Sequence, residues 1–379
     1  MKKYDVAAYI WPAYTGDEER TRMFWPEGIG EWQTVKNIKD TLQDKPGYHW
    51  DRKPVWGYVN EADPYVMEMQ IEAAVDHGVN VFIYDWYWYD NRPFLENCLN
   101  DGFLKAKNHD KMKFYLMWAN HDATNLWDRR TSHASTTIWE GKVTTEQFYT
   151  IGRRWIKQYF KLPCYYCIDG KPVVSIYDVA NFIQGMGGIE EARNAMNWLR
   201  EEAVREGLPG VHIQMIKWGD NNLNLSGVDG SAMELPQLEA LRVLEFDSCT
   251  HYQYVHFTDV NRDYCEIVPD VLKEWEMTRL AMPIAEASET KEYFPHVSIG
   301  WDNNPRFYEY KDNIMTGNTP EEFERALLEA KLFLDSHNKT PLITINSWNE
   351  WTETSYLEPD TLYGYGYLQA IKNVFMEKK

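Results

Sequence analysis

The sequence predicts an α/β fold, a single (β/α)8 TIM barrel in which eight parallel strands are surrounded by helices. Short β-rich runs alternate with helical segments along the 379 residues, as in chains whose parallel strands are joined by crossover helices. Eight such runs fit a closed barrel, and the chain length lies within the range of this class. No G-x-G-x-x-G follows the first strand and no G-x-x-x-x-G-K-S/T occurs, so an open nucleotide-binding sheet is disfavoured.

The predicted strands are short runs rich in apolar and β-branched residues. Turn residues and helix-ending glycines separate them, with Gly78 before the second strand and Gly207 before the fifth. In chain order, strands are expected at 6–10, 79–84, 113–117, 173–177, 211–216, 248–252, 296–299 and 342–346. Helical periodicity is expected to place helices outside the barrel at 65–77, 94–107, 146–160, 190–206 and 367–376.

We expect one catalytic domain over residues 1–379, because no repeat, low-complexity tract or linker divides the chain. The largest irregular part is an extended segment, 14–63, between the first strand and the first helix. It is rich in tryptophan, proline and charge, and we expect it to shape one end of a cleft. Within it, Glu31 and Trp32 are candidates for sugar contact; the alternative is that they anchor a packed loop.

The net charge excludes some partners. With 39 basic and 58 acidic residues the formal charge is -19, and no basic cluster offsets it, so nucleic acid would be repelled. Aromatic residues are abundant, with 17 tryptophans and 25 tyrosines, and they gather near the predicted strand ends. Most belong to packing, but a buried indole needs a partner for its N–H group, so tryptophan is a costly filler.

The sequence predicts no cofactor and no metal site. Five cysteines, an odd number, disfavour a disulfide framework, and Cys164 and Cys167 form a C-x-x-C pair without a second pair at zinc spacing. No H-E-x-x-H or G-x-S-x-G motif is present. The first residues carry no signal peptide and no apolar run reaches a membrane span, so a cytoplasmic location is expected unless a leader was removed. Oligomeric state cannot be read from the sequence.

The most informative motif follows the last predicted strand. There Asn349, Glu350 and Glu353 are set around Trp348 and Trp351. Reactive groups of parallel barrels lie at the carboxyl ends of the strands. Paired carboxylates supply acid and base chemistry, and flat apolar rings contact pyranose faces. The motif therefore predicts a site that cleaves sugars, with Glu350 and Glu353 as the catalytic pair; the alternative is two surface charges beside core indoles.

Similar residues follow the other strands, and a barrel brings strand ends to one rim. Tryptophan appears after six of the eight predicted strands. Asp178 and Asp220 are equally well explained as helix or turn caps, and His251 is expected to be a core histidine. The candidates for substrate contact are Trp11, Asp85, Trp86, Trp118, Asn120, His121, Trp218, Tyr252, Trp301, Asp302, Asn349 and Trp351, together with Glu31 and Trp32.

Three motifs connect the chain to a known family. Residues 348–353 (W-N-E-W-T-E), followed by L-E-P at 357–359, look like an N-E-W-x-E…E-P signature. Residues 28–35 are similar to a G-F-x-E-W-x-x-V element, and W-A-N at 118–120 matches a third. In these motifs, which occur in the same order, the chain resembles the glycoside hydrolase family 99-like, or WbsX-like, proteins, and the resemblance covers it from the N-terminus to about residue 359.

The resemblance implies a (β/α)8 barrel and a retaining, endo-acting α-glycosidase whose best-known substrates are α-mannosides. The residue matching Glu353 is then the general acid/base. The residue matching Glu350 acts as a base on the sugar's own 2-hydroxyl, which gives a 1,2-anhydro intermediate. Two positions depart from the pattern and bear on the substrate more than on the fold: His121 stands where an acidic residue follows W-A-N, and Thr352 stands where the hydrolases often have histidine.

The predicted function is therefore hydrolysis of an α-linked glycan, manno-configured or related, with an oligo- or polysaccharide as substrate. Two alternatives remain. WbsX-like proteins have carried a glycosyltransferase label near polysaccharide gene clusters, although no D-x-D motif or nucleotide-phosphate cradle is evident here. A non-catalytic glycan-binding barrel would be expected to lack one of the two glutamates, and both are present. Sugar, linkage, stereochemical course and endo or exo action stay open.

Overall fold

The fold comes from a computed structural model that describes residues 4–16, 18–38, 45, 47–219, 222–228, 234–283 and 291–376. Asp220, expected at the rim, lies outside these residues. In the described part the eight predicted parallel strands are confirmed, with shifts of a few residues at their ends. They are β1 (Asp5–Ile10), β2 (Val81–Tyr89), β4 (Lys113–Trp118), β8 (Lys171–Ile176), β9 (His212–Ile216), β12 (Ser248–Thr250), a seventh strand made of β13 (Glu292–Tyr293) and β14 (His296–Ser298), and β15 (Leu342–Asn346).

The seventh strand closes the sheet into a TIM barrel. The hydrogen-bonded order runs β13-β12-β9-β8-β4-β2-β1-β15-β14, so its two ends are consecutive pieces of one segment. Phe294 N donates to the carbonyl of Cys249 in β12 at 2.9 Å, and Thr344 N in β15 donates to the carbonyl of Pro295 at 3.1 Å. Because this segment pairs on both sides, the strand ends converge on one rim.

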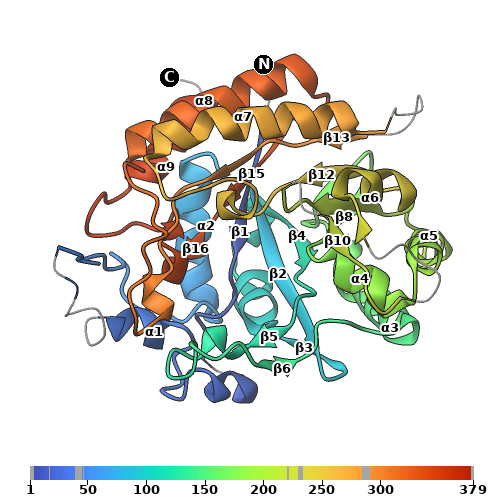
Figure 1. Ribbon diagram of the computed structural model, residues 1–379, viewed down its shortest axis with the longest axis horizontal. Coiled ribbons are helices and arrows are strands. Elements are labelled where there is room, and N and C mark those ends of the chain that lie inside the picture. The colour runs from blue at the N-terminus through green and yellow to red at the C-terminus, as the bar shows by residue number, and fades with distance from the viewer. Residues whose placement is uncertain are drawn as a thin grey trace.

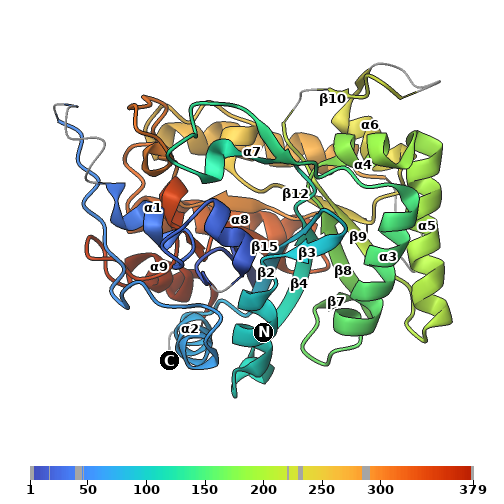
Figure 2. The ribbon, with the colours of Figure 1, turned by 90° about the horizontal axis from the view of Figure 1, so that it is seen from below.

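Helices surround the sheet (Figures 1 and 2). The predicted helices at 65–77, 146–160, 190–206 and 367–376 are confirmed, the second of them continuing into the π-helical turn η7 (Ile156–Phe160). None of the helices in the described ranges is long and apolar enough to cross a membrane. The α-helices are α1 (Trp32–Lys36), α2 (Pro64–Asp76), α3 (Thr145–Trp155), α4 (Val179–Met186), α5 (Ile189–Arg205), α6 (Gln237–Val243), α7 (Tyr264–Ala281), α8 (Pro320–His337) and α9 (Gly366–Phe375).

The helix predicted at 94–107 is wrong. Strand β2 continues past the expected end and turns at Asp90 and Asn91, both with positive φ. The chain then returns as β3 (Arg92–Phe94), antiparallel to β2, and the rest forms only the short turns η3 (Cys98–Gly102) and η4 (Phe103–Lys105). The helices α1, α4, α6, α7 and α8 were not predicted. Helices α7 and α8 lie next to each other (Figure 1).

The loops at the rim contain short hairpins. They are β5 (Ala123–Thr124) with β6 (Thr137–Trp139), β10 (Leu223–Asn224) with β11 (Glu234–Leu235), and β16 (Asn349–Glu350) with β17 (Ser355–Tyr356). The smaller elements of the described chain are β7 (Cys167–Ile168), which pairs with β8, and several short helical turns: η1 (Glu19–Met23), η5 (His109–Lys111), η6 (Asn125–Trp127), η8 (Tyr254–His256), η9 (Asn304–Arg306) and η10 (Trp351–Glu353).

Several side chains in the buried core are polar and hydrogen-bonded to one another. Ser175 Oγ donates to Gln214 Oε1 at 2.7 Å, and the Thr250 and Thr344 hydroxyls lie 2.8 Å apart. His296 reaches Thr344 Oγ1 at 3.0 Å, and burial holds the pKa of this histidine well below its usual range. Buried polar groups that find partners inside the protein give a core with one defined packing.

Candidate active site

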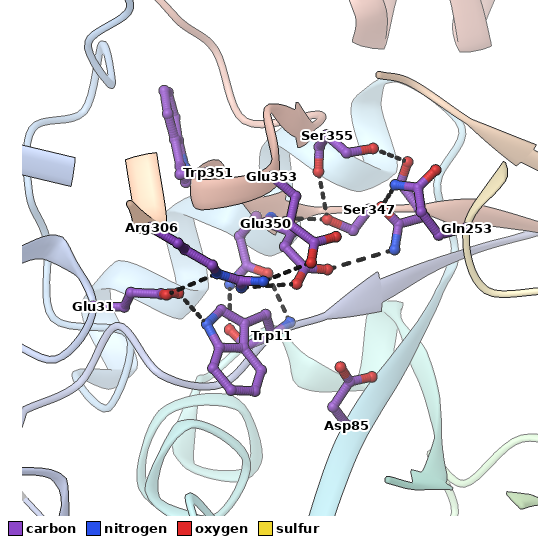
Figure 3. A network of polar contacts seen from close by, with 12 residues as sticks. Trp11, Glu31, Asp85, Gln253, Arg306, Ser347, Glu350, Trp351, Glu353 and Ser355 are labelled. Atoms are coloured by element: carbon purple, nitrogen blue, oxygen red, sulfur yellow. Dashed lines mark hydrogen bonds and ion pairs between the residues drawn. The ribbon is translucent and has the colours of Figure 1, made fainter. Parts of the chain in front are cut away.

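The turn after β15 presents both predicted catalytic glutamates (Figure 3). Strands β16 and β17 pair as a hairpin, and η10 between them places Glu350 just before a single helical turn and Glu353 at its end. Thr354 closes this turn in the left-handed region, with φ 58°. Ser347 Oγ accepts a hydrogen bond from Glu350 N at 2.8 Å, which fixes the start of the turn. Glu350 is 4% exposed and Glu353 8%.

Arg306, from η9 after the seventh strand, joins the carboxylates. Its Nη1 lies 2.6 Å from Glu353 Oε1, its Nη2 lies 3.2 Å from Glu350 Oε1, and its Nε lies 3.3 Å from Glu31 Oε1. The side chain is 5% exposed, so its contacts with the three carboxyl groups are shielded from water. A planar guanidinium with several donors suits this arrangement, because it can hold carboxylates at fixed mutual positions.

The protonation of Glu353 suits an acid. Burial raises the pKa of Glu353 to about 8, the negative charge of Glu350 adds to the shift, and Arg306 opposes it. A carboxyl group with such a pKa keeps its proton at neutral pH. The site therefore places a carboxyl group that keeps its proton at neutral pH beside Glu350, with both side chains on one arginine.

On the other side of the pair stands Tyr252, which follows β12. Its hydroxyl lies 2.8 Å from Glu350 Oε2 and 2.9 Å from Asp85 Oδ2. Successive side chains of a strand point to opposite faces of the sheet. In β2, Asp85 therefore points toward Tyr252 and Trp86 points the other way. Trp86 Nε1 donates to Glu96 at 2.7 Å, and the ring packs against Trp155 of α3. The structure thus brings Asp85 and Tyr252 into the site and leaves Trp86 in the outer core.

Glu31 also enters the site, from the extended segment. It is fully buried, accepts from Trp11 Nε1 at 2.5 Å and pairs with Arg306. The turn before it depends on Gly30, which has φ 58° and leaves no room for a side chain. A Cβ atom there would lie 1.8 Å from the carbonyl oxygen of Ala13.

Replacing Gly30 with alanine is expected to displace Glu31 from Arg306 and to lower the thermal unfolding midpoint. Relief of the clash requires backbone movement, which costs on the order of 1–3 kcal/mol. The matched control is Gly364→Ala, because Gly364 has a similar φ of 57° but nothing within 4 Å of a Cβ atom. Equal midpoints for the two variants in a thermal shift assay would contradict this role for Gly30.

A second layer of polar groups holds the β16 hairpin in place. Asn349 Nδ2 donates to the carbonyl of Trp11 at 2.9 Å and to both oxygens of Glu61, while its Oδ1 accepts from Trp11 N at 2.8 Å. Gln70 Nε2 then bridges Glu61 and Glu358. Burial raises the pKa of Glu61 to about 7. Asn349, expected to bind substrate, is thus a support for the neighbouring Glu350.

Most of the candidate indoles belong to packing. Trp351 stacks on Tyr356 with ring centroids 3.8 Å apart and donates to Glu358 at 2.6 Å, which turns it away from the carboxylates (Figure 3). Trp118 packs between Phe148 and Phe182. These burials argue against sugar contact by four of the candidates, each no more than 2% exposed: Trp32, Trp86, Trp118 and Trp351.

Some of the remaining candidates hold neighbouring backbone in place, and others are partly exposed. Asn120 joins two strand ends by donating to the carbonyl of Asp178, which itself caps α4, and Asp302 accepts from Tyr48 and from Asn304 in η9. Trp11 is 2% exposed and packs on Trp127. His121 and Trp218 are partly exposed, and Trp301 is 9% exposed. His251, fully buried, bonds to Tyr293 and Glu274, as expected of a core histidine.

Comparisons with known proteins identify the family of this chain. Residues 6–371 match the family described as Glycosyltransferase WbsX. The chain belongs to the WbsX family. Two strains of Xanthomonas campestris pv. campestris have relatives named "Uncharacterized protein WxcX", each 25% identical over 355 residues, covering 92% of this chain and 46% of the relative. The chain thus spans about half the length of these relatives.

Solved structures support the barrel of this WbsX-family chain. A "Glycoside hydrolase-like protein" is 15% identical and superposes with a TM-score of 0.63, covering 100% of this chain and 95% of the other. The GH99 endo-α-mannosidase of Bacteroides thetaiotaomicron is 13% identical with a TM-score of 0.56, covering 97% and 95%. The similarity expected from the sequence motifs is therefore confirmed for family and fold.

Sequence reasoning missed several residues of the site in this WbsX-family chain. Arg306 lies on an irregular loop with no motif around it, and only its position after the seventh strand pointed to the rim. Tyr177, at the end of β8, lies 5.2 Å from Tyr252 between ring centroids. It also borders a cavity of about 210 Å³ whose lining includes Trp218, Asn222 and His256. From the sequence, Tyr177 was predicted only as the last residue of a strand.

Proposed function

We propose that this WbsX-family chain is a glycoside hydrolase that cleaves an α-linked glycan, manno-configured or related. The observation that carries the proposal is the pair Glu350 and Glu353 held on Arg306 at the carboxyl end of β15. The family 99 barrel is that of an endo-α-mannosidase in B. thetaiotaomicron, which favours the same bond type here. The cavity beside Tyr177 and Trp218 offers room for a neighbouring sugar unit.

In the first step, Glu353 acts as the general acid. Its raised pKa keeps the proton on the carboxyl group at neutral pH, ready for the oxygen that leaves the anomeric carbon. The nearby Glu350 accepts the proton of the sugar's 2-hydroxyl, whose oxygen then attacks the anomeric carbon. This forms a 1,2-anhydro sugar as the glycosidic bond breaks.

In the second step, water opens the 1,2-anhydro ring. Glu353, now a carboxylate, takes a proton from the attacking water, and Glu350 returns its proton to the 2-oxygen. Two inversions at the anomeric carbon give overall retention. Arg306 contacts both glutamates throughout, so it favours the ionised form of whichever carboxyl group has given up its proton.

Glu350→Gln is expected to bind the glycan and not turn it over. The amide keeps the size of the side chain and loses the base, which contributes about 10²–10⁴-fold to the rate. Titration calorimetry with an α-manno-oligosaccharide would measure binding, and product analysis by mass spectrometry would measure cleavage. Turnover at the wild-type rate would remove Glu350 from the role of base.

A glycosyltransferase is the second candidate, because the family description carries that name. The two functions differ in what they consume. A hydrolase shortens an oligosaccharide in buffer alone, whereas a transferase lengthens an acceptor only when a nucleotide-sugar is added. Incubating the wild type under both conditions and weighing the products separates them.

A further inference from the structure

Asp85 is a buried carboxyl group of the site that the proposed two-glutamate mechanism does not use. It lies at the carboxyl-terminal half of β2 and is 4% exposed. Its Oδ2 lies 2.9 Å from the Tyr252 hydroxyl, which also lies 2.8 Å from Glu350 Oε2. Its other oxygen, Oδ1, is buried and has no hydrogen-bond partner in the part of the chain that the structure describes. A buried oxygen without a partner lowers the stability of the protein unless a ligand donates a hydrogen bond to it.

The tyrosine between the two carboxyl groups has a single proton to donate. A phenol hydroxyl donates one hydrogen bond and accepts others. Both oxygen–oxygen distances are those of hydrogen bonds, so Tyr252 donates to one carboxylate and accepts from the other group. One of the two carboxyl groups, Asp85 or Glu350, must therefore carry a proton of its own.

The surroundings of the two groups decide which one keeps the proton. Glu350 faces Arg306 Nη2 at 3.2 Å and Asn346 Nδ2 at 3.5 Å, both donors that suit a carboxylate. Among the residues that the structure describes, no cation interacts with Asp85. The titratable groups that interact with it are tyrosines and acids: Tyr9, Tyr87, Tyr177, Tyr252, Glu350 and Glu353.

The pKa of Asp85 agrees with this assignment. Burial raises it well above the ordinary value for aspartate, the charge of Glu350 raises it further, and the Tyr252 hydrogen bond opposes the shift. Two buried carboxyl groups joined through one hydroxyl are not expected to ionise together.

We propose that Asp85 is held as a neutral carboxylic acid that positions Glu350 through Tyr252 and binds a hydroxyl group of the sugar. Asp85 Oδ2–H donates to the Tyr252 oxygen, and the Tyr252 hydroxyl donates to Glu350 Oε2. Asp85 Oδ1 is then a carbonyl-type oxygen that accepts from the sugar. The sugar-binding part rests on the proposed function; the protonation does not.

The protonation is tested by infrared spectroscopy on protein carrying ¹³C-labelled aspartate at neutral pH. We expect the carbonyl stretch of a protonated aspartic acid in the wild type and its loss in Asp85→Asn. The matched control is Asp76→Asn, at an exposed position on α2, which should keep the band. A wild-type spectrum from which Asp85→Asn removes only carboxylate absorption would overturn the proposal, whether or not any glycan is cleaved.

Kinetics test the role in the site. The asparagine side chain resembles the neutral acid, since Nδ2 donates to Tyr252 and Oδ1 accepts from the sugar. Asp85→Asn should therefore lower kcat/KM by no more than about tenfold, and Asp85→Ala by about 100-fold or more, as on loss of a preorganised polar group. The limbs of the pH profile should stay in place in Asp85→Asn. Equal losses in both variants, or limbs that move in Asp85→Asn, would show an ionised Asp85 instead.

Discussion

Glu353→Gln is expected to lower kcat/KM for unactivated glycans by about 10²–10⁴-fold, the usual contribution of a general acid. An aryl glycoside with a good leaving group should be partly spared, because its oxygen needs little protonation. The profile of kcat/KM against pH gives a second readout. The acid form of Glu353 is lost as the pH rises through about 8, so wild-type activity should fall there.

The same substitution has a consequence for stability that does not depend on the substrate. The pKa of Glu353 rises from 4.5 to about 8 on folding, so the folded state binds the proton more tightly. The stabilisation that this protonated group gives the folded state is therefore present at low pH, and it is lost as the pH rises from 4.5 to about 8. Glu353→Gln should gain stability relative to the wild type between pH 5 and pH 8 in denaturant titrations.

The kinetic prediction has its own contradicting result. An equal loss of kcat/KM on activated and unactivated substrates would remove Glu353 from the role of acid.

Arg306→Met is expected to lower the free energy of unfolding by about 3–5 kcal/mol at pH 8, as when one partner of a buried ion pair is removed. The substitution leaves Glu31, Glu350 and Glu353 buried without their shared cation. The pKa values of Glu31 and Glu353, which burial raises and Arg306 lowers, should then rise further. A carboxyl group whose pKa is raised on folding destabilises the folded state more as the pH increases. The loss of unfolding free energy in Arg306→Met should therefore be larger at pH 8 than at pH 5.

The control for this prediction is Arg205→Met on α5. Arg205 is 57% exposed and pairs with Glu201 and Glu202 at the surface. Exposed pairs contribute little and are screened by solvent, so this variant should unfold close to the wild type. Denaturant titration of both variants at pH 5 and pH 8 makes the comparison. An Arg306→Met deficit that is absent, or equal at the two pH values, would contradict the role of Arg306 as the shared counter-charge.

The sequence was sufficient for the strands and for the position of Glu350 and Glu353 at the rim. Runs such as 342–346 are apolar and β-branched, and the barrel then places Glu350 and Glu353 at the rim. It was insufficient where irregular backbone decides the position. Arg306 reaches the glutamates from a loop whose path depends on Asp302 and Asn304, and these contacts have no signature in the residue pattern.

The indoles show a second limit. Trp86 was expected just past a strand end but lies within β2, and Trp118 is the last residue of β4. Alternation along the strands turns both rings toward Trp155 of α3. Asp85, one residue before Trp86, faces the site for the same reason. To know which face of the sheet a residue occupies, one needs the strand register of the barrel. A shift of the register by one residue exchanges the two faces.

Whether the chain is a glycosidase with its acid at Glu353 is best tested by direct product analysis. Wild type, Glu353→Gln and the surface variant Glu329→Gln are incubated with a panel of α-linked manno-, gluco- and rhamno-oligosaccharides. Products are read by mass spectrometry, and the first-formed anomer by NMR. We predict shorter oligosaccharides with retained configuration from the wild type and from Glu329→Gln, and product formation at least about 100-fold slower from Glu353→Gln. Cleavage by Glu353→Gln at the wild-type rate, or products that form only when a nucleotide-sugar is added, would contradict the assignment of a glycosidase with its acid at Glu353.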